Sequence, residues 1–272
     1  MRLYFLLFIL FNFSLTAFPQ LIDGYKEEVE YDKESSFGIN INTIGGMIGG
    51  VDGRFAWKRK DGEWDALYLQ LVNIKNSKEI RAQAPATGNI YTPGKIVSLY
   101  VFRTQYGEEK RLFWKGDEDG VRLSWVYAGG LSFGILKPYY IEYDYTIYVF
   151  KPNGQLDFEN IDFDTRFEAY DPIKHTNIGR IQGAGSFGQG FNELSSRLGV
   201  NFKTAINLEF GMFNRAVSGI ETGFLIEYFP KAIRMFPEPV KPIKLQTSVF
   251  ISIYFGNRSK SKPKAQISEI PQ

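Results

Sequence analysis

The sequence predicts an all-β protein, a transmembrane antiparallel up-and-down β-barrel of about eight strands with long extracellular loops. Three observations predict it. Apolar and polar residues alternate with period two along most of the chain, as in strands with two different faces. Short and long connections follow one another between the alternating segments. The chain is also rich in aromatic residues (16%) and glycine (27 of 272 residues), which favours twisted strands and tight turns.

The first residues are predicted to be an export signal at residues 1–17. Arg2 precedes an apolar run from Leu3 to Phe11, and small residues follow up to Ala17. This order is typical of a secretory signal peptide. The apolar run is shorter than the about 20 residues that a membrane-spanning helix needs. An uncleaved N-terminal anchor is the alternative. Residues 18–34 are then a periplasmic N-terminal segment.

Eight alternating segments form the predicted barrel, which occupies residues 35–256. The clearest is Val121–Leu136, where large apolar residues such as Trp125 and Phe133 alternate with small ones such as Ala128 and Ser132. The other seven lie near residues 37–42, 51–58, 64–73, 96–105, 197–211, 217–228 and 243–255. Several have the about 9–11 residues that a tilted strand needs to cross a bilayer.

A soluble lipocalin-like barrel gives a similar alternation, with its apolar face turned inward. Three features favour the membrane instead. The polar faces are rich in Gly, Ala and Ser, which suits the crowded lumen of a narrow barrel. The last strand ends on Tyr254-Phe255, an ending of the kind that barrel-assembly machinery recognises. Short turns and long loops also alternate, as between the periplasmic and external sides of a membrane barrel. The short turns are 58–63 and 211–215, with an intermediate one at 107–119; the loops are 75–95, 138–194 and 229–242, after a short first loop near 45–50.

Composition excludes several classes of function. The chain has no cysteine and one histidine, which excludes disulfide frameworks, cysteine nucleophiles and multi-histidine metal sites. Its 32 basic and 30 acidic residues nearly balance, so no basic stripe favours nucleic acid. We predict no cofactor and no metal. Residues 257–272 are predicted to be a disordered basic periplasmic tail.

Charged residues on the small-residue faces are predicted to fill the lumen. Closing eight strands leaves an interior that side chains just fill. Both signs of charge occur in nearly equal number, which favours mutual pairing, because a buried charge without a partner costs several kcal/mol. A narrow porin-like channel is the alternative. The predicted lumen charge network is Asp52, Arg54, Arg122, Lys203, Glu209, Glu221 and Glu227.

The loop 138–194 is the candidate functional region, because loops longer than about 15 residues are usually functional or disordered. Its first part contains five tyrosines and is expected to extend strands beyond the membrane, with the tyrosines forming an interfacial girdle. An acidic run follows, which we interpret as a solvated face. Bound divalent cations are the alternative, although the spacing matches no calcium loop. The run comprises Asp157, Glu159, Asp162, Asp164, Glu168 and Asp171.

His175 raises the possibility of an enzyme. Asp171 lies four residues before it, and Ser186, Ser195 or Ser196 could supply a hydroxyl. A histidine general base must lie within about 3 Å of the hydroxyl that it activates. The sequence contains no nucleophile elbow that would arrange this. We predict no catalytic residue and interpret His175 as structural; an outer-membrane enzyme acting on lipid A or peptide through His175 is the alternative.

Four segments carry a resemblance to known proteins. They are residues 74–80, residues 94–103, Gly129-Gly130 with residues 137–140, and Tyr170-Asp171-Pro172-Ile173-Lys174-His175 continuing through Ile178-Gly179-Arg180 to Phe191. The chain resembles, over residues 35–256, outer-membrane β-barrel proteins common in Bacteroidota, which are porin-family-like and have no assigned function. It departs from them at residues 182–185. The resemblance implies an outer-membrane location and a barrel, but no reaction.

The favoured hypothesis is a non-catalytic surface or envelope-complex component that binds a partner through its extracellular loops. The loop candidates are Tyr170, Asp171, His175 and Arg180. Expected partners are outer-membrane lipid and lipopolysaccharide, the barrel-assembly machinery and an envelope protein.

Overall fold

The computed structural model describes residues 31–113, 121–157, 161–210 and 216–260. The predicted signal peptide at residues 1–17, the segment from 18 to 30, and the predicted tail from residue 261 onward lie outside the described residues. Within the described ranges, no helix is both long and apolar enough to cross a bilayer.

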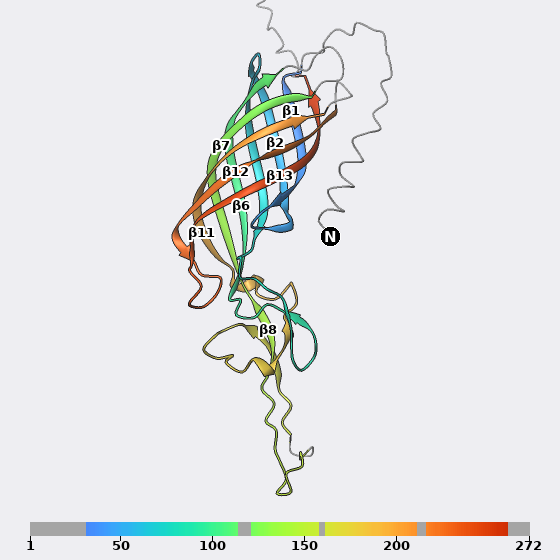
Figure 1. Ribbon diagram of the computed structural model, residues 1–272, viewed down its shortest axis with the longest axis vertical. Helices are drawn as coiled ribbons and strands as arrows, with labels where there is room; N and C mark the ends of the chain where they lie inside the picture. Colours follow the sequence, from blue (N-terminus) through green and yellow to red (C-terminus); the bar gives the residue numbers. More distant parts are fainter. Residues whose placement is uncertain (1–30, 114–120, 158–160, 211–215, 261–272) are drawn as a thin grey trace, which may run out of the picture. The chain divides into compact units, whose positions relative to one another are not determined.

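Eight antiparallel strands form a closed barrel (Figure 1). Going round the barrel, the order is β1, β13, β12, β11, β7, β6, β3 and β2, so every strand pairs with its neighbours along the chain. β1 and β13 close the ring, with Ile39 opposite Ile253. The predicted up-and-down barrel of eight strands is confirmed. Its strands are β1 (Lys33–Asn42), β2 (Gly46–Lys60), β3 (Glu63–Ile74), β6 (Val97–Phe113), β7 (Arg122–Pro138), β11 (Ser195–Glu209), β12 (Ala216–Ile233) and β13 (Ile243–Ser259).

Most strands are longer than the alternation predicted. β6 extends into the turn predicted at 107–119 and ends at Phe113. β12 extends into the loop predicted at 229–242 and ends at Ile233. The first loop is also shorter than predicted, because β2 begins at Gly46. β1 and β13 extend the barrel to residues 33–259. Charged residues near the strand ends concealed these extensions, since pairing continues there although the apolar face does not.

The two faces of the strands have the predicted orientation. On β11, Ile206 and Leu208 are partly exposed on the exterior, whereas Ala205 and Asn207 are buried in the lumen. Apolar exposure recurs on the exterior of every barrel strand. Since such a continuous apolar surface is unfavourable in water, it is the surface that a membrane barrel presents to lipid. Examples are Phe37, Ile39, Val51, Leu71, Phe102, Leu131, Phe133, Val200, Phe202, Phe224, Ile226, Val249 and Ile251.

Glycine allows two barrel strands to approach closely at one lumen position. A Cβ built on Gly130 of β7 would lie 1.9 Å from the carbonyl oxygen of Thr104 on β6. Any larger residue would push β6 and β7 apart there.

The predicted loop 138–194 contains short strands, the first of which continues β7 beyond the barrel. β8 (Tyr140–Asp144) lies between β9 (Thr165–Ala169) and β10 (Ile181–Ala184) in an antiparallel sheet, which we call the outer sheet. A single residue, Tyr139, separates β8 from β7 (Figure 1). Ile141 and Tyr143 of β8 and Ile181 of β10 pack together in the apolar core of the outer sheet. The remaining short elements are β4 (Ala82–Gln83), which pairs with β5 (Ile90–Tyr91), and the 3₁₀ turns η1 (Ile178–Arg180) and η2 (Phe191–Glu193).

Candidate functional site

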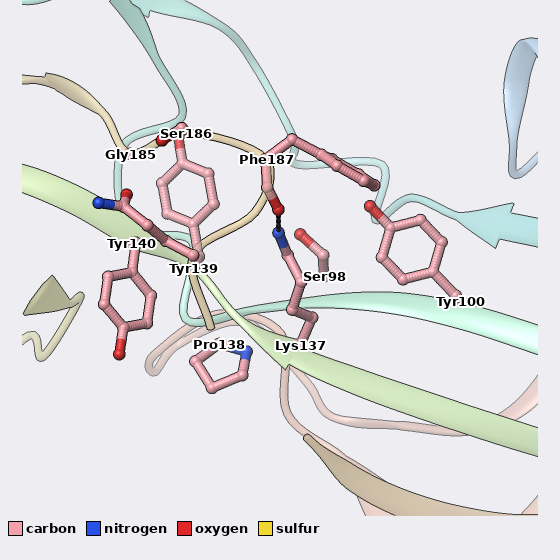
Figure 2. Close-up of a pocket in the computed structure, with 10 residues that line it drawn as sticks. Ser98, Tyr100, Lys137, Pro138, Tyr139, Tyr140, Gly185, Ser186 and Phe187 are labelled. Carbon is pink, nitrogen blue, oxygen red and sulfur yellow. Dashed lines mark hydrogen bonds between the residues drawn. The ribbon is translucent and has the colours of Figure 1, made fainter. Parts of the chain in front are cut away.

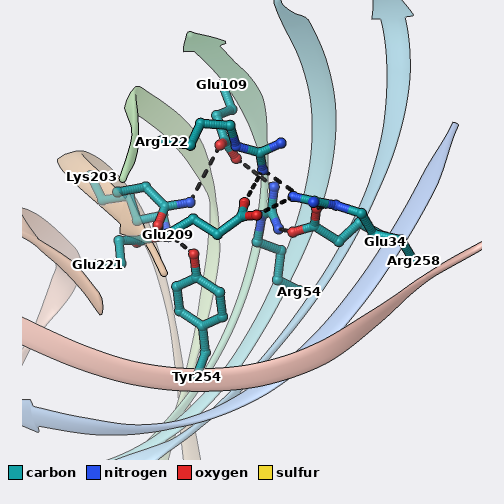
Figure 3. Close-up of polar contacts among 10 residues, drawn as sticks. Glu34, Arg54, Glu109, Arg122, Lys203, Glu209, Glu221, Tyr254 and Arg258 are labelled. Carbon is teal, nitrogen blue, oxygen red and sulfur yellow. Dashed lines mark hydrogen bonds and ion pairs between the residues drawn. The ribbon is translucent and has the colours of Figure 1, made fainter. Parts of the chain in front are cut away.

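The lumen contains a buried network of ion pairs near the end where the chain enters and leaves the barrel (Figure 3). Arg54 of β2 pairs with Glu34 of β1 and with Glu109 of β6. Arg258 joins the same network, with its Nε 3.0 Å from Glu34 Oε2 and its Nη2 paired with Glu209. The side chains of the three glutamates, Glu34, Glu109 and Glu209, are each at least 94% buried. The network therefore connects strands on different sides of the barrel.

A second group of polar residues crosses the lumen farther along the strands. Arg103 of β6 makes a two-point contact with Glu227 of β12, at 2.8 and 2.9 Å. Glu227 also accepts a hydrogen bond from Ser132 of β7. Lys203 of β11 lies between the two groups, 2.6 Å from Glu221 and 3.4 Å from the centre of the Tyr68 ring. Charge-assisted contacts of this kind are the strong ones in a low-dielectric interior.

All seven predicted lumen charges face the interior, and six of them form ion pairs. The exception is Asp52, which accepts hydrogen bonds at 2.7 and 2.8 Å from the Ser252 hydroxyl and has no ion pair with a described residue. The prediction missed four further charged members of the network. They are Glu34, Arg103, Glu109 and Arg258.

Apolar side chains pack across the lumen at the end nearest the outer sheet. Ile74 ends β3, Leu99 lies near the start of β6, and Phe229 and Ile233 end β12; all four are fully buried. The connection that follows β12 is fixed to the barrel, because the Ile96 amide donates to the Met235 carbonyl at 2.8 Å. The lumen is thus filled by ion pairs along its length and by an apolar layer at this end.

His175, in the turn that follows β9, is buried, and both its ring nitrogens have partners. Nδ1 accepts a hydrogen bond from the Asp171 amide at 2.9 Å, so Nε2 carries the proton and donates it to Glu168 at 2.9 Å. The ring also stacks on Tyr170, with ring centres 5.8 Å apart. These contacts close the turn 171–175. The side chains that bond to or stack on His175 do not include Ser186, Ser195 or Ser196, so the geometry gives no base–nucleophile pair for the enzyme alternative.

Glu168 of β9 is the centre of this cluster. Its carboxylate accepts hydrogen bonds from Lys174, Tyr145 and His175. Burial alone would raise the pKa of Glu168, but these three donors outweigh it and lower the pKa from 4.5 to about 2. The fourth loop candidate, Arg180, lies farther away, with Nη1 3.5 Å from the carbonyl of Asp144. Tyr170, Asp171 and His175 therefore form one cluster that fixes the loop after β9, and Arg180 contacts β8.

The predicted acidic run does not form a cation site among the described residues. No group of three or more His, Cys, Asp or Glu side chains there is arranged to hold a metal. Asp164 instead pairs with Arg166, and Glu168 binds its three donors. Glu159 of the run lies outside the described residues.

The loops that join the strands of the outer sheet expose apolar side chains, and the sheet itself has an open edge. Phe150 is 63% exposed, Phe163 73% and Ile173 87%. Within the described residues, β9 has β8 on one side and no strand on the other. The Tyr145 amide donates to the Asp164 carbonyl, and the Tyr170 amide to the Tyr139 carbonyl. The backbone amide and carbonyl groups of the even-numbered residues of β9 therefore point toward β8. Those of residues 165, 167 and 169 point toward the open edge.

A closed strand ladder with an apolar exterior and a paired polar lumen is the structure that spans an outer membrane, because every backbone amide is paired inside the bilayer. The chain is an outer-membrane β-barrel protein.

No protein-family model matches the chain, and no curated protein matches it. The Bacteroidota resemblance thus stays a prediction. Two crystal structures of Ail, the attachment invasion locus protein of Yersinia pestis, align with 85% of this chain and 100% of theirs, each at a TM-score of 0.38 and with 8% or 10% identity; one holds the heparin analogue sucrose octasulfate. Neisserial surface protein A aligns over 85% of this chain and 97% of its own, at a TM-score of 0.32 and 8% identity. At such scores the likeness carries no weight, and the fold assignment rests on the strand pairing of the chain itself.

Proposed function

We propose that this protein is a non-catalytic surface component of the outer membrane that binds a partner protein through its outer sheet. In this orientation, the short turns, the start of β1 and the end of β13 face the periplasm. The outer sheet then stands on the cell surface, following the usual arrangement of such barrels. The barrel anchors the sheet, and the sheet binds the partner.

The open edge of β9 carries the proposal. Residues 165, 167 and 169 present backbone donors and acceptors that no described strand pairs. An exposed edge of this kind is a template for strand addition by an extended segment of another chain. Phe167, which is 50% exposed on this strand, offers an apolar contact to such a segment. The partner is therefore a protein with an extended segment that carries an apolar residue opposite Phe167.

The filled lumen supports this function over the channel alternative. An ion crossing the barrel would have to displace the Arg103–Glu227 pair and the apolar layer around Phe229 and Ile233. The hydrogen bonds of His175 likewise support a structural role for that residue, because a general base needs a free nitrogen beside its substrate.

Strand addition is tested by changing Phe167. Phe167→Pro removes an amide on the open edge without removing a hydrogen bond to β8, and proline is tolerated at such positions. A photoreactive residue placed at position 165 on intact cells should crosslink one partner protein, and Phe167→Pro should abolish the crosslink. Ile80→Ala is the control, because Ile80 is also apolar and exposed (72%) but lies in another loop. An undiminished crosslink in Phe167→Pro would reject strand addition.

A further inference from the structure

A small cavity lies on the exterior of the barrel beneath the segment 185–189 (Figure 2). Its volume is about 230 Å³, and its walls come from the first residues of β6, the end of β7 and that segment. Ser98, Tyr100 and Lys137 stand on the outward-facing side of their strands, since their neighbours Leu99 and Leu136 point into the apolar layer of the lumen. The cavity thus belongs to the lipid-facing wall of the barrel and not to the lumen.

Lys137 brings a buried positive charge into this cavity. It is 7% exposed, and no carboxylate among the described residues forms an ion pair with it. Its ammonium donates to the Phe187 carbonyl and lies 4.6 and 4.9 Å from the ring centres of Phe187 and Phe191. A carbonyl and two ring faces leave the charge of a buried ammonium uncompensated. An anionic group in the cavity would complete its coordination.

Neutral donors without partners surround the ammonium. Ser98 is 9% exposed, and its hydroxyl has no hydrogen bond to any described residue. Figure 2 shows the hydroxyls of Ser98 and Tyr100 directed toward the side of the cavity where Lys137 ends. Ser186 adds another hydroxyl to the lining. The buried Oε1 of Gln189 also has no partner, but it is an acceptor and does not bind phosphate oxygens. One cation with several hydroxyl donors matches the multiple oxygens of a phosphate better than a single carboxylate.

The height of the cavity in the membrane identifies the source of that phosphate. Trp125 and Tyr127 pack together on the exterior of β7, and Tyr127 hydrogen-bonds to Glu108. Aromatic and charged residues together on an exterior face mark a membrane interface. Lys137 follows Tyr127 by ten positions on β7. At about 3.3 Å per residue and a tilt of about 40°, this corresponds to about 25 Å, the height of the apolar band of a membrane barrel. Lys137 therefore lies at the opposite interface, among lipid headgroups.

We propose that this cavity binds the phosphate of an outer-leaflet lipid headgroup. Lys137 contributes the charge, the Ser98 and Tyr100 hydroxyls contribute hydrogen bonds, and Phe187, which is 70% exposed, lies beside the acyl chains as an interfacial aromatic. The inference rests on the orientation given under the proposed function but not on partner binding at β9. Failure of either idea leaves the other standing.

The test is native mass spectrometry of the full chain in detergent, with phosphorylated lipid A and the same lipid A after phosphate removal. The phosphorylated form should bind at least about tenfold more tightly, as expected for charge-assisted hydrogen bonds. Lys137→Gln should remove the preference, whereas Lys231→Gln, which removes an exposed charge from β12, should retain it. Ser98→Leu fills the cavity while keeping the ammonium, and it too should remove the preference. Heat-modifiable gel mobility verifies that each variant is folded.

Two outcomes would overturn the proposal. Equal binding of the two lipids by the wild-type protein, or an unchanged preference in folded Lys137→Gln, would show that the cavity does not recognise lipid phosphate. Displacement of lipid A by an equal concentration of inorganic phosphate would assign the site to a free anion instead of a lipid.

Discussion

The lumen and the outer sheet both bury charged groups, but they do so in different surroundings. In the lumen, Arg103 and Glu227 are enclosed by strands whose outer faces contact lipid. In the outer sheet, Glu168 is surrounded by donors and still has 24% of its side chain exposed. Water cannot replace a partner lost in the lumen, whereas it can in the outer sheet. The same ion-pair chemistry should therefore stabilise the whole barrel in one region and only the local conformation in the other.

The largest effect is expected from breaking a lumen pair. Glu227→Ala leaves the Arg103 guanidinium, which is 3% exposed, without its carboxylate. Leaving a buried charge unpaired costs about 3–5 kcal/mol. Urea unfolding of the protein in lipid vesicles, followed by gel mobility, measures this loss. The double variant Arg103→Met with Glu227→Leu should recover most of it, because apolar replacement of a buried pair is often neutral. A double variant as unstable as Glu227→Ala would contradict this explanation.

A charge on the exterior of the barrel should have the next largest effect. Leu131 is 54% exposed and lies on β7 between Tyr127 and Lys137. Leu131→Lys should cost about 2–4 kcal/mol, as for a cation near the middle of the bilayer. Val121→Lys, placed before Trp125 at the interface, should cost about 0–1 kcal/mol. Urea unfolding in vesicles again measures both. Equal costs of the two substitutions would mean that Leu131 does not lie near the middle of the bilayer and Val121 at its interface.

The alternation predicted the strands of the barrel, because a barrel strand has one apolar and one polar face along its whole length. It failed at the ends of strands. Glu34 and Arg258 lie just outside the predicted barrel, yet they have the inward parity of Ser36 and Tyr254. Extending the period-two pattern past the apolar residues would have included both.

Arg103 and Glu109 were missed for a related reason. They lie in β6, whose predicted segment alternated less cleanly and stopped at residue 105. The sequence indicated that strands continue past the barrel after residue 138, but the pairing of the outer sheet could not be predicted, because β8 and β9 have five residues each and are separated by 20 residues. Their pairing depends on contacts such as that of Tyr145, directly after β8, with Glu168 of β9, and no local pattern in the sequence encodes such contacts.

His175→Ala tests the outer sheet. It removes the acceptor of the Asp171 amide and one donor to Glu168. Loss of these buried hydrogen bonds should destabilise the local fold by about 1–3 kcal/mol. Protease cleavage within residues 138–194 of intact cells should increase, while the barrel keeps its heat-modifiable mobility. Ile173→Ala, at an exposed position of the same turn, should change neither property. Loss of the folded barrel in His175→Ala would contradict the separation of the two regions.

Acid should have the smallest effect, and it should be confined to the outer sheet. The pKa of Glu168 is lowered from 4.5 to about 2 in the folded sheet. The carboxylate thus stabilises the sheet above about pH 4.5, and this contribution is lost as the pH falls toward 2. Acid-stable protease digestion should detect loosening of the sheet in that range. Glu168→Gln should reduce the pH dependence, leaving the part due to Asp144, whose pKa is also lowered. A wild-type sheet that resists protease equally at pH 5 and pH 2.5 would contradict this role of Glu168.

The most direct test of the separation between anchor and binding sheet is to replace residues 141–183 with a short Gly/Ser linker. The urea midpoint of the barrel in vesicles is the quantity to measure. Because the ion pairs and the apolar layer of the lumen remain intact, the midpoint should stay within error of that of the wild-type protein. A fall as large as that caused by Glu227→Ala would show that the outer sheet is part of the barrel's stability, and would contradict its role as a separate binding surface.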